Sequence, residues 1–86
     1  MPLFIIERNF AEQLEMNRSV VADVTRVNAD VGVHWLFSFL SADQKKTYCL
    51  YEAPSAEAIR EAARRLDIPA DVIIEISSEI RPEAYA

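Results

Sequence analysis

The sequence has few of the residues that build metal centres, disulfides or flexible turns. Its 86 residues include one cysteine, one histidine and one glycine. A single cysteine excludes a disulfide within the chain. One histidine and one cysteine also cannot complete a self-contained zinc finger, which needs about four nitrogen or sulfur ligands. Any metal site must therefore recruit carboxylates, water or a second chain.

Long apolar runs and blocks of like charge are also missing from the sequence. The apolar run near its start, Leu3 to Ile6, is shorter than the roughly 7–15 residues of a signal-peptide core, and no basic residue precedes it. This predicts a cytoplasmic protein with no membrane partner. The 14 acidic and nine basic residues give a net charge of −5. Because this charge repels phosphate backbones, we do not expect a nucleic-acid partner.

Length and composition predict one domain over residues 1–86. The chain is 51% hydrophobic and 27% charged, a balance typical of a globular protein rather than a disordered segment. Independent domains usually start at roughly 50 residues, so this length leaves no room for a second one. No Gly- or Ser-rich linker divides the sequence.

The first part of the chain predicts a strand followed by a helix. Residues 3–9 begin with an apolar run typical of a buried strand, and residues 10–18 predict a loop with some helical character. Ser19 is the expected N-cap of the helix. The apolar stripe of this helix consists of Val20, Val24, Val27 and Val31. Gly32 should end the helix because glycine takes positive φ without a steric clash.

Residues 33–41 predict a second strand that is apolar on both faces. Strict alternation places one set on a common face: Val33, Trp35, Phe37 and Phe39. An antiparallel sheet with one wet face should alternate between apolar and polar residues, so we expect a partner to cover the second face of this strand. Residues 42–45 predict a turn into a third strand over residues 46–53.

The remaining residues predict a second helix and a fourth strand. Ser55 is the expected N-cap of the helix, whose apolar stripe consists of Ile59, Ala62, Ala63 and Leu66. Residues 72–80 alternate as a half-buried strand. The order βαββαβ predicts an α+β, ferredoxin-like sandwich with two helices on one face of a four-stranded antiparallel sheet. Because the other face stays bare, we expect a homodimer in which the open faces meet.

His34 and Cys49 are the candidate metal ligands or nucleophilic groups, on neighbouring strands of the predicted hairpin. A Cys–His nucleophile also needs an oxyanion hole, and no glycine-rich turn offers one. The favoured role of Cys49 by this reasoning is a small buried hydrophobe. Another possibility is a carboxylate cluster formed by glutamates on or near strands: Glu7, Glu52, Glu75 and Glu79.

Aromatic residues indicate either a ligand pocket or a dimer face. The candidates are Trp35, Phe37, Phe39 and Tyr51. RNA-recognition modules with the same element order stack bases on sheet aromatics. Here, however, Tyr48 and Tyr51 differ in parity and should point to opposite faces. Together with the acidic net charge, this argues against RNA binding.

Several segments, taken in order, carry a family resemblance. They are Phe4–Arg8, Trp35-Leu36 with Ser38, residues 46–54 (KTYCLYEAP), residues 55–60 and residues 68–71. In this order and spacing they resemble a family of small bacterial proteins, first classed as a domain of unknown function and associated with nickel binding in a ferredoxin-like dimer. The resemblance implies a dimeric sandwich, nickel or another divalent transition metal as cofactor, and Cys49 as a ligand.

Two positions depart from the pattern of this family. Its members often have histidine where this chain has Phe37 and Ala62, and without these imidazoles most nitrogen donors suited to nickel are lost. His34 could replace one of them only if it faces the same side as Cys49. The resemblance therefore implies a small dimeric ligand- or metal-binding protein without established catalysis. The alternatives are a dimeric α/β-barrel enzyme for a small organic substrate, similar to cofactor-independent monooxygenases in element order, and a plain dimerisation module.

Overall fold

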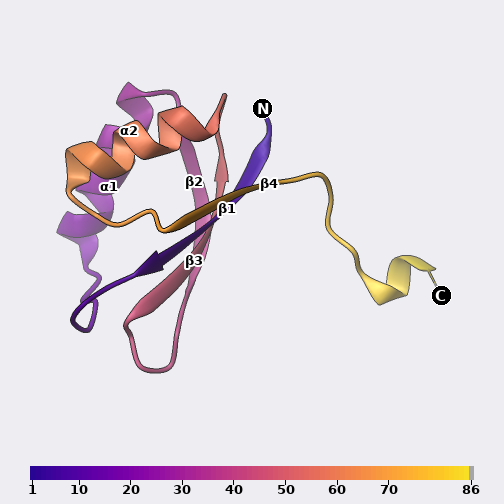
Figure 1. The fold of residues 1–86 in the computed structure, drawn as a ribbon, viewed down its shortest axis with the longest axis horizontal. Coiled ribbons are helices and arrows are strands. Elements are labelled where there is room, and N and C mark those ends of the chain that lie inside the picture. Colours follow the sequence, from indigo (N-terminus) through magenta and orange to yellow (C-terminus); the bar gives the residue numbers. More distant parts are fainter. Residues whose placement is uncertain (86) are drawn as a thin grey trace.

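The computed structural model describes residues 1–85 and has the predicted order of elements. In chain order they are β1 (Leu3–Asn9), α1 (Arg18–Asp30), β2 (His34–Leu40), β3 (Lys46–Glu52), α2 (Ala56–Leu66), β4 (Val72–Ile76) and a 3-10 helix, η1 (Pro82–Tyr85). Neighbouring strands are antiparallel, and their order across the sheet is β2-β3-β1-β4. Both helices lie on one side of the sheet (Figure 1). The predicted ferredoxin-like α+β sandwich is confirmed.

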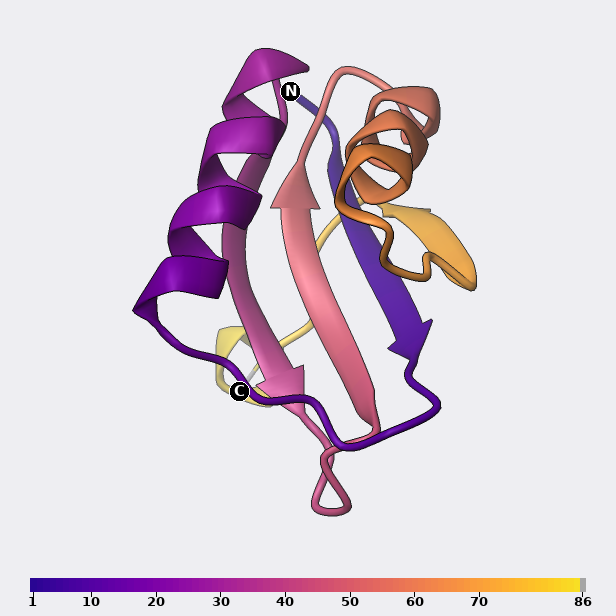
Figure 2. The ribbon, with the colours of Figure 1, turned by 90° about the vertical axis from the view of Figure 1, so that its left-hand side faces the viewer.

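The sheet has an inner face, which the helices cover (Figure 2), and an outer face, which they leave open (Figure 1). Burial alternates along the two central strands, β1 and β3, so every second side chain points inward. The resulting core consists of Phe4, Ile6, Val33, Cys49, Tyr51, Ala53 and Ile59. Full burial of a large apolar side chain contributes about 1.5–3 kcal/mol, so the inner face holds most of the stabilising contacts.

The helix boundaries follow local hydrogen bonding. Asn17, not Ser19, caps α1, because the Asn17 side chain accepts a hydrogen bond from the Val20 amide at 3.0 Å. The predicted Ser19 cap is therefore wrong. The predicted Ser55 cap of α2 is confirmed, because its hydroxyl accepts from the Ala58 amide at 3.3 Å.

Strand β2 contains a bulge that changes which side chains share a face. Trp35 pairs with Tyr51, but Phe37 pairs with the adjacent Leu50, so Leu36 is an extra residue in the ladder. Trp35 therefore faces inward, whereas Phe37 and Phe39 face outward. The predicted common face of these aromatics is wrong, because one inserted residue reverses the parity of every later position.

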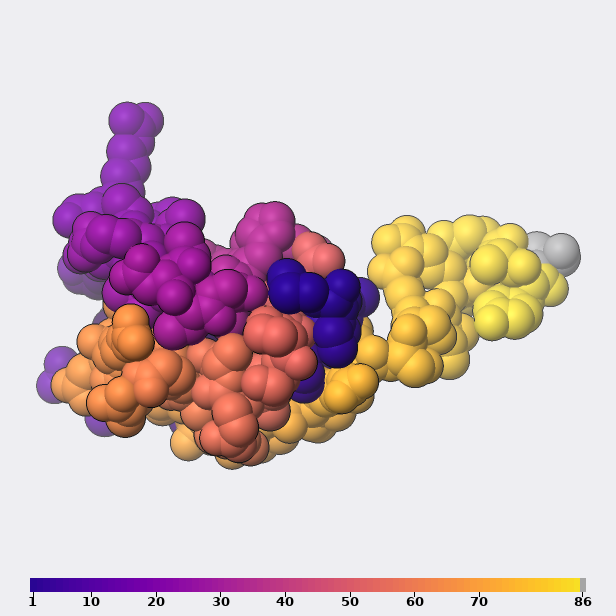
Figure 3. Space-filling view, turned by 90° about the horizontal axis from the view of Figure 1, so that it is seen from above, coloured from indigo at the N-terminus to yellow at the C-terminus, as the bar shows by residue number. Residues whose placement is uncertain are grey.

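Strand β4 is shorter than the predicted strand over residues 72–80. It ends at Ile76, which pairs with Leu3 at the start of β1. Beyond Leu3 the next possible partner is Pro2, which has no backbone N–H to donate. The tail, residues 77–85, then leaves the sheet on its outer side (Figures 1 and 3). Within residues 1–85, no helix combines the length and apolar character needed to cross a membrane.

Candidate functional site

The outer face of the sheet carries apolar side chains from all four strands. This outer apolar patch consists of Leu3, Ile5, Phe37, Phe39, Tyr48, Leu50, Val72, Ile74 and Ile76. Phe39 is 67% exposed and Ile74 54% exposed, although both are large hydrophobic residues. A hollow of about 400 Å³ lies against the patch, bordered on the tail side by Glu79. Contiguous exposed apolar surface of this kind marks an interaction site.

Polar pairs border the patch at both ends of the sheet. At one end the His34 Nδ1 atom lies 3.4 Å from a Glu52 carboxylate oxygen, on paired positions of β2 and β3. At the other end the Lys46 ammonium group lies 3.7 Å from the Glu7 carboxylate. An apolar centre with a charged rim is the usual composition of a protein interface.

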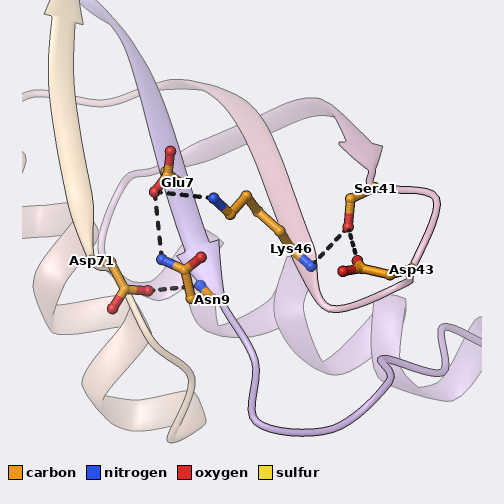
Figure 4. A network of polar contacts seen from close by, with 6 residues as sticks. All are labelled: Glu7, Asn9, Ser41, Asp43, Lys46 and Asp71. Carbon is orange, nitrogen blue, oxygen red and sulfur yellow. Dashed lines mark hydrogen bonds and ion pairs between the residues drawn. The ribbon is translucent and has the colours of Figure 1, made fainter.

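Hydrogen bonds hold the Glu7–Lys46 end of the sheet in place (Figure 4). The backbone amide of Asn9 donates to the Asp71 carboxylate at 2.7 Å, and this bond connects β1 to the chain entering β4. In the β2–β3 turn, the Ser41 hydroxyl donates to Asp43 at 2.7 Å. This bond is the largest cause of a pKa of the Asp43 carboxyl below its usual value. A hydrogen bond from the Lys45 backbone amide is the next largest cause. The charged rim at this end is thus part of an ordered network.

The inner face contains a separate cavity of about 70 Å³, here called the inner cavity. It lies between the sheet, α1 and the loop over residues 10–17. Two backbone bonds hold this loop against the β2–β3 turn: the Phe10 amide donates to the Lys45 carbonyl and the Leu14 amide to the Gln44 carbonyl, both at 2.7 Å. The loop was predicted with helical character, but it has none and instead closes one wall of the cavity.

The polar side of the inner cavity is built around Arg8 and Tyr51. Arg8 is 4% exposed and its guanidinium donates to the Pro69 carbonyl at 2.6 Å and to the Tyr51 hydroxyl at 3.4 Å. The Asn28 side chain, also buried, donates to the same hydroxyl at 3.5 Å. Trp35 stacks near Tyr51 and donates through Nε1 to the Ser38 hydroxyl at 2.8 Å.

The predicted site residues divide between the two faces. Cys49 is 5% exposed and lines the inner cavity, with its Sγ atom 3.6 Å from the Thr47 hydroxyl. His34 pairs with Glu52 and faces outward, so the two predicted metal ligands do not meet within one chain. In the described part of the chain, no cluster of three or more His, Cys, Asp or Glu side chains could hold a metal ion. The predicted glutamates therefore form no such metal-holding cluster among residues 1–85.

The predicted aromatic set is also divided. Trp35 and Tyr51 line the inner cavity, whereas Phe37 and Phe39 belong to the outer apolar patch. The bulge at Leu36 separates Trp35 from Phe37, so the four aromatic residues do not line one common pocket. Tyr48 and Tyr51 point to opposite faces, as their parity predicted.

Two buried polar residues that donate to the Tyr51 hydroxyl, Arg8 and Asn28, are not singled out by the sequence patterns. Arg8 has the same parity in β1 as the buried Phe4 and Ile6. Asn28 lies one turn after Val24 on α1 and is buried with it, although the predicted apolar stripe consists of valines alone. Charged and amide side chains are rarely buried, so position in a strand or helix does not by itself predict that these two point inward.

Burial raises the pKa of the Tyr51 phenol above its usual value of about 10, although the nearby Arg8 charge opposes the shift. We expect the Tyr51 phenolate to form only above that pH. The folded chain then holds a proton that the unfolded chain has released, so the free energy of unfolding should fall as pH rises above about 10. Absorbance at 295 nm, compared between wild type and Tyr51→Phe, isolates this titration. A Tyr51 signal complete by about pH 10 would contradict the prediction.

Fold and site together define a small α+β domain of the ferredoxin-like class whose outer sheet face is apolar and uncovered. Residues 4–76 match the family described as nickel responsive protein SCO4226-like, so the chain belongs to this family and the predicted resemblance is confirmed. SCO4226 from Streptomyces coelicolor A3(2), known from a crystal structure, has a similar fold, with a TM-score of 0.78 and 24% identity over 91% of this chain and 99% of that one. No curated protein sequence matches the chain significantly.

Proposed function

We propose that this protein works as a homodimer whose sheets pack outer face against outer face, and that the dimer binds a divalent transition-metal ion such as nickel. The observation that carries the proposal is the outer apolar patch, which crosses all four strands and has the ion pairs of these strands at its two ends. A second copy is the natural occupant, because a two-fold axis places the same apolar patch on both sides of the interface.

The size of the sheet indicates what the dimer must include. Four strands spaced about 4.8 Å apart, each of up to seven residues, present roughly 19 by 23 Å, or about 440 Å² before side-chain relief. A stable interface buries about 800 Å² on each partner. The sheet alone therefore supplies about half of that area, and another segment must supply the rest.

The tail, residues 77–85, is positioned to supply this area. It projects from the outer side of the sheet, away from both helices (Figure 3). Two apolar side chains on it, Ile80 and Tyr85, are 78% and 77% exposed. In the proposed dimer each tail lies along the partner and buries these side chains.

The metal part of the proposal rests on the name of the family and on the His34–Glu52 pair. Imidazole and carboxylate are both ligands for divalent metals, and His34 and Glu52 lie at the border of the proposed dimer face. Among residues 1–85, one chain supplies two donors here, so water and donors of the second chain complete the coordination. Cys49 is less suited, because it is buried on the opposite face of the sheet, with its Sγ atom beside the Thr47 hydroxyl.

The dimer is tested by the mass of the wild-type protein in solution. We expect multi-angle light scattering at micromolar concentration to give twice the chain mass of 9.8 kDa. Salt screens attractions between charges, whereas the proposed interface is held by the apolar patch. Raising the salt concentration should therefore not dissociate the dimer. A single species of 9.8 kDa would refute the dimer and with it any metal site that needs two chains.

Metal binding is tested by equilibrium dialysis against nickel followed by elemental analysis. We expect about one nickel per chain in the wild type and an affinity weakened by more than about tenfold in His34→Ala, which removes the imidazole donor. Cys49→Ala is the matched control and should bind as the wild type does. Loss of binding in Cys49→Ala alone would identify Cys49 as the ligand instead, and no near-stoichiometric nickel in the wild type would reject the metal proposal.

A further inference from the structure

The inner cavity contains a buried positive charge without a negative partner. Arg8 takes part in none of the ion pairs among residues 1–85. The groups that accept hydrogen bonds from its guanidinium are the Pro69 carbonyl and the Tyr51 hydroxyl, which are neutral. A buried charge is costly unless an opposite charge compensates it, so an anion in the cavity would be strongly stabilised.

Two hydroxyl groups add hydrogen-bond donors to the same cavity. The Ser38 hydroxyl accepts from the Trp35 indole, and the Tyr51 hydroxyl accepts from Arg8 and Asn28. Because indole and guanidinium N–H groups can only donate, both hydroxyl oxygens serve as acceptors and keep their own protons for another partner. Ser38, Tyr51 and Arg8 all line the cavity and contribute to the small polar part of a mostly apolar lining.

Most of the rest of the cavity wall is apolar. It includes Leu14 from the loop, Val20 and Val24 from α1, and Trp35 from β2. The cavity volume of about 70 Å³ is roughly half that of an engineered apolar cavity of about 150 Å³ that binds benzene, but this cavity is partly open to solvent. A ligand as large as benzene therefore fits only with one end at the opening. A ligand that fits must therefore be small and must combine one negative charge with an apolar part.

We infer that the inner cavity is a binding site for a small carboxylate with a short apolar tail. The carboxylate contacts Arg8, whose planar guanidinium matches carboxylate geometry, and accepts hydrogen bonds from the Tyr51 and Ser38 hydroxyls. The apolar part of the ligand packs against Val20, Val24 and Leu14. Inorganic phosphate fits less well, because it has no apolar part and carries more charge than one guanidinium compensates. This site lies on the inner face and depends neither on the dimer nor on the metal.

Trp35 provides the readout, because it is the only tryptophan in the chain and lines the cavity. We expect sodium butyrate to produce a saturable change in its fluorescence at constant pH and ionic strength. Butyramide has the same shape without the charge and should bind at least about tenfold more weakly. Equal affinity for butyrate and butyramide, tighter binding of phosphate than of butyrate, or no saturable response to butyrate would overturn the inference.

Variants of the protein test whether the Arg8 guanidinium binds the carboxylate. Arg8→Met keeps an unbranched side chain but removes the guanidinium, and should weaken butyrate binding at least about tenfold. Arg65→Met, which removes an exposed arginine of α2, is the matched control and should bind as the wild type does. Circular dichroism checks that each variant folds. If Arg8→Met does not fold, two other measurements test the site. Ser38→Ala should weaken butyrate binding about threefold to tenfold, and butyramide should bind the wild type more weakly than butyrate does. Wild-type affinity in folded Arg8→Met would reject the site.

Discussion

Phe39→Glu is expected to separate the proposed homodimer into monomers without unfolding the chain. Phe39 lies in the outer apolar patch, 67% exposed, with its ring edge-on to Phe37 at 5.6 Å between centroids. In the monomer a glutamate at this position stays in water and changes the free energy of unfolding little. In the dimer the same carboxylate would be buried in an apolar interface without a partner, which costs several kcal/mol. The dimer dissociation constant should rise by about 100-fold or more.

Sedimentation velocity over a concentration series measures this change. Val21→Glu is the matched control, because Val21 is also an exposed apolar residue but lies on α1, on the helix side of the molecule. It should leave the dissociation constant unchanged. If Phe39→Glu remains as dimeric as Val21→Glu, the outer face is not the interface and the proposed function must be revised.

Ile6→Ala is expected to lower the free energy of unfolding by about 3–4 kcal/mol. Ile6 lies on β1, one of the two central strands, has no exposed surface and belongs to the core together with Ile59. Truncation removes three carbon atoms from a position enclosed by strands and helix, so the site can collapse only in part. Small domains have a total stability of about 5–15 kcal/mol, so the variant should be close to unfolding.

Urea denaturation followed by circular dichroism measures the loss. The experiment is best done in the Phe39→Glu background, where unfolding is expected to be unimolecular and independent of protein concentration. Ile6→Val, which removes a single methyl group, serves as a graded comparison and should cost about 0.5–1.5 kcal/mol. A cost below about 1 kcal/mol for Ile6→Ala would mean that the inner face is packed less tightly than its burial indicates.

The two proposed sites use opposite faces of one sheet, and this arrangement follows from alternation in β1 and β3. Arg8 points inward to the cavity, whereas its neighbour Glu7 points outward to Lys46. Cys49 and Tyr48 divide in the same way. Because successive side chains of a strand alternate, one short sheet can form a dimer on one face and hold a ligand on the other. Variants on one face should therefore leave the other function intact.

Much of the fold was predictable because it depends on local periodicity. The apolar stripes at helical spacing, the Ser55 cap and the alternation in β1 and β3 each follow from interactions between residues close in sequence. The ferredoxin-like order follows from the sequence of these elements. The predicted element boundaries agree less well with the structure. Asn17, not Ser19, caps α1, and β4 ends at Ile76 because β1 offers no further partner.

The candidate sites depended on pairing that local patterns do not encode. In β2 the single bulge at Leu36 sends Trp35 inward and Phe37 outward, although regular alternation would have kept them together. The register between β2 and β3 likewise places His34 beside Glu52 and away from Cys49. The sequence by itself thus determined the elements, their order and the need to cover a second apolar face. Only the tertiary structure decided which side chains meet, because strand register and bulges arise from contacts between residues far apart in the chain.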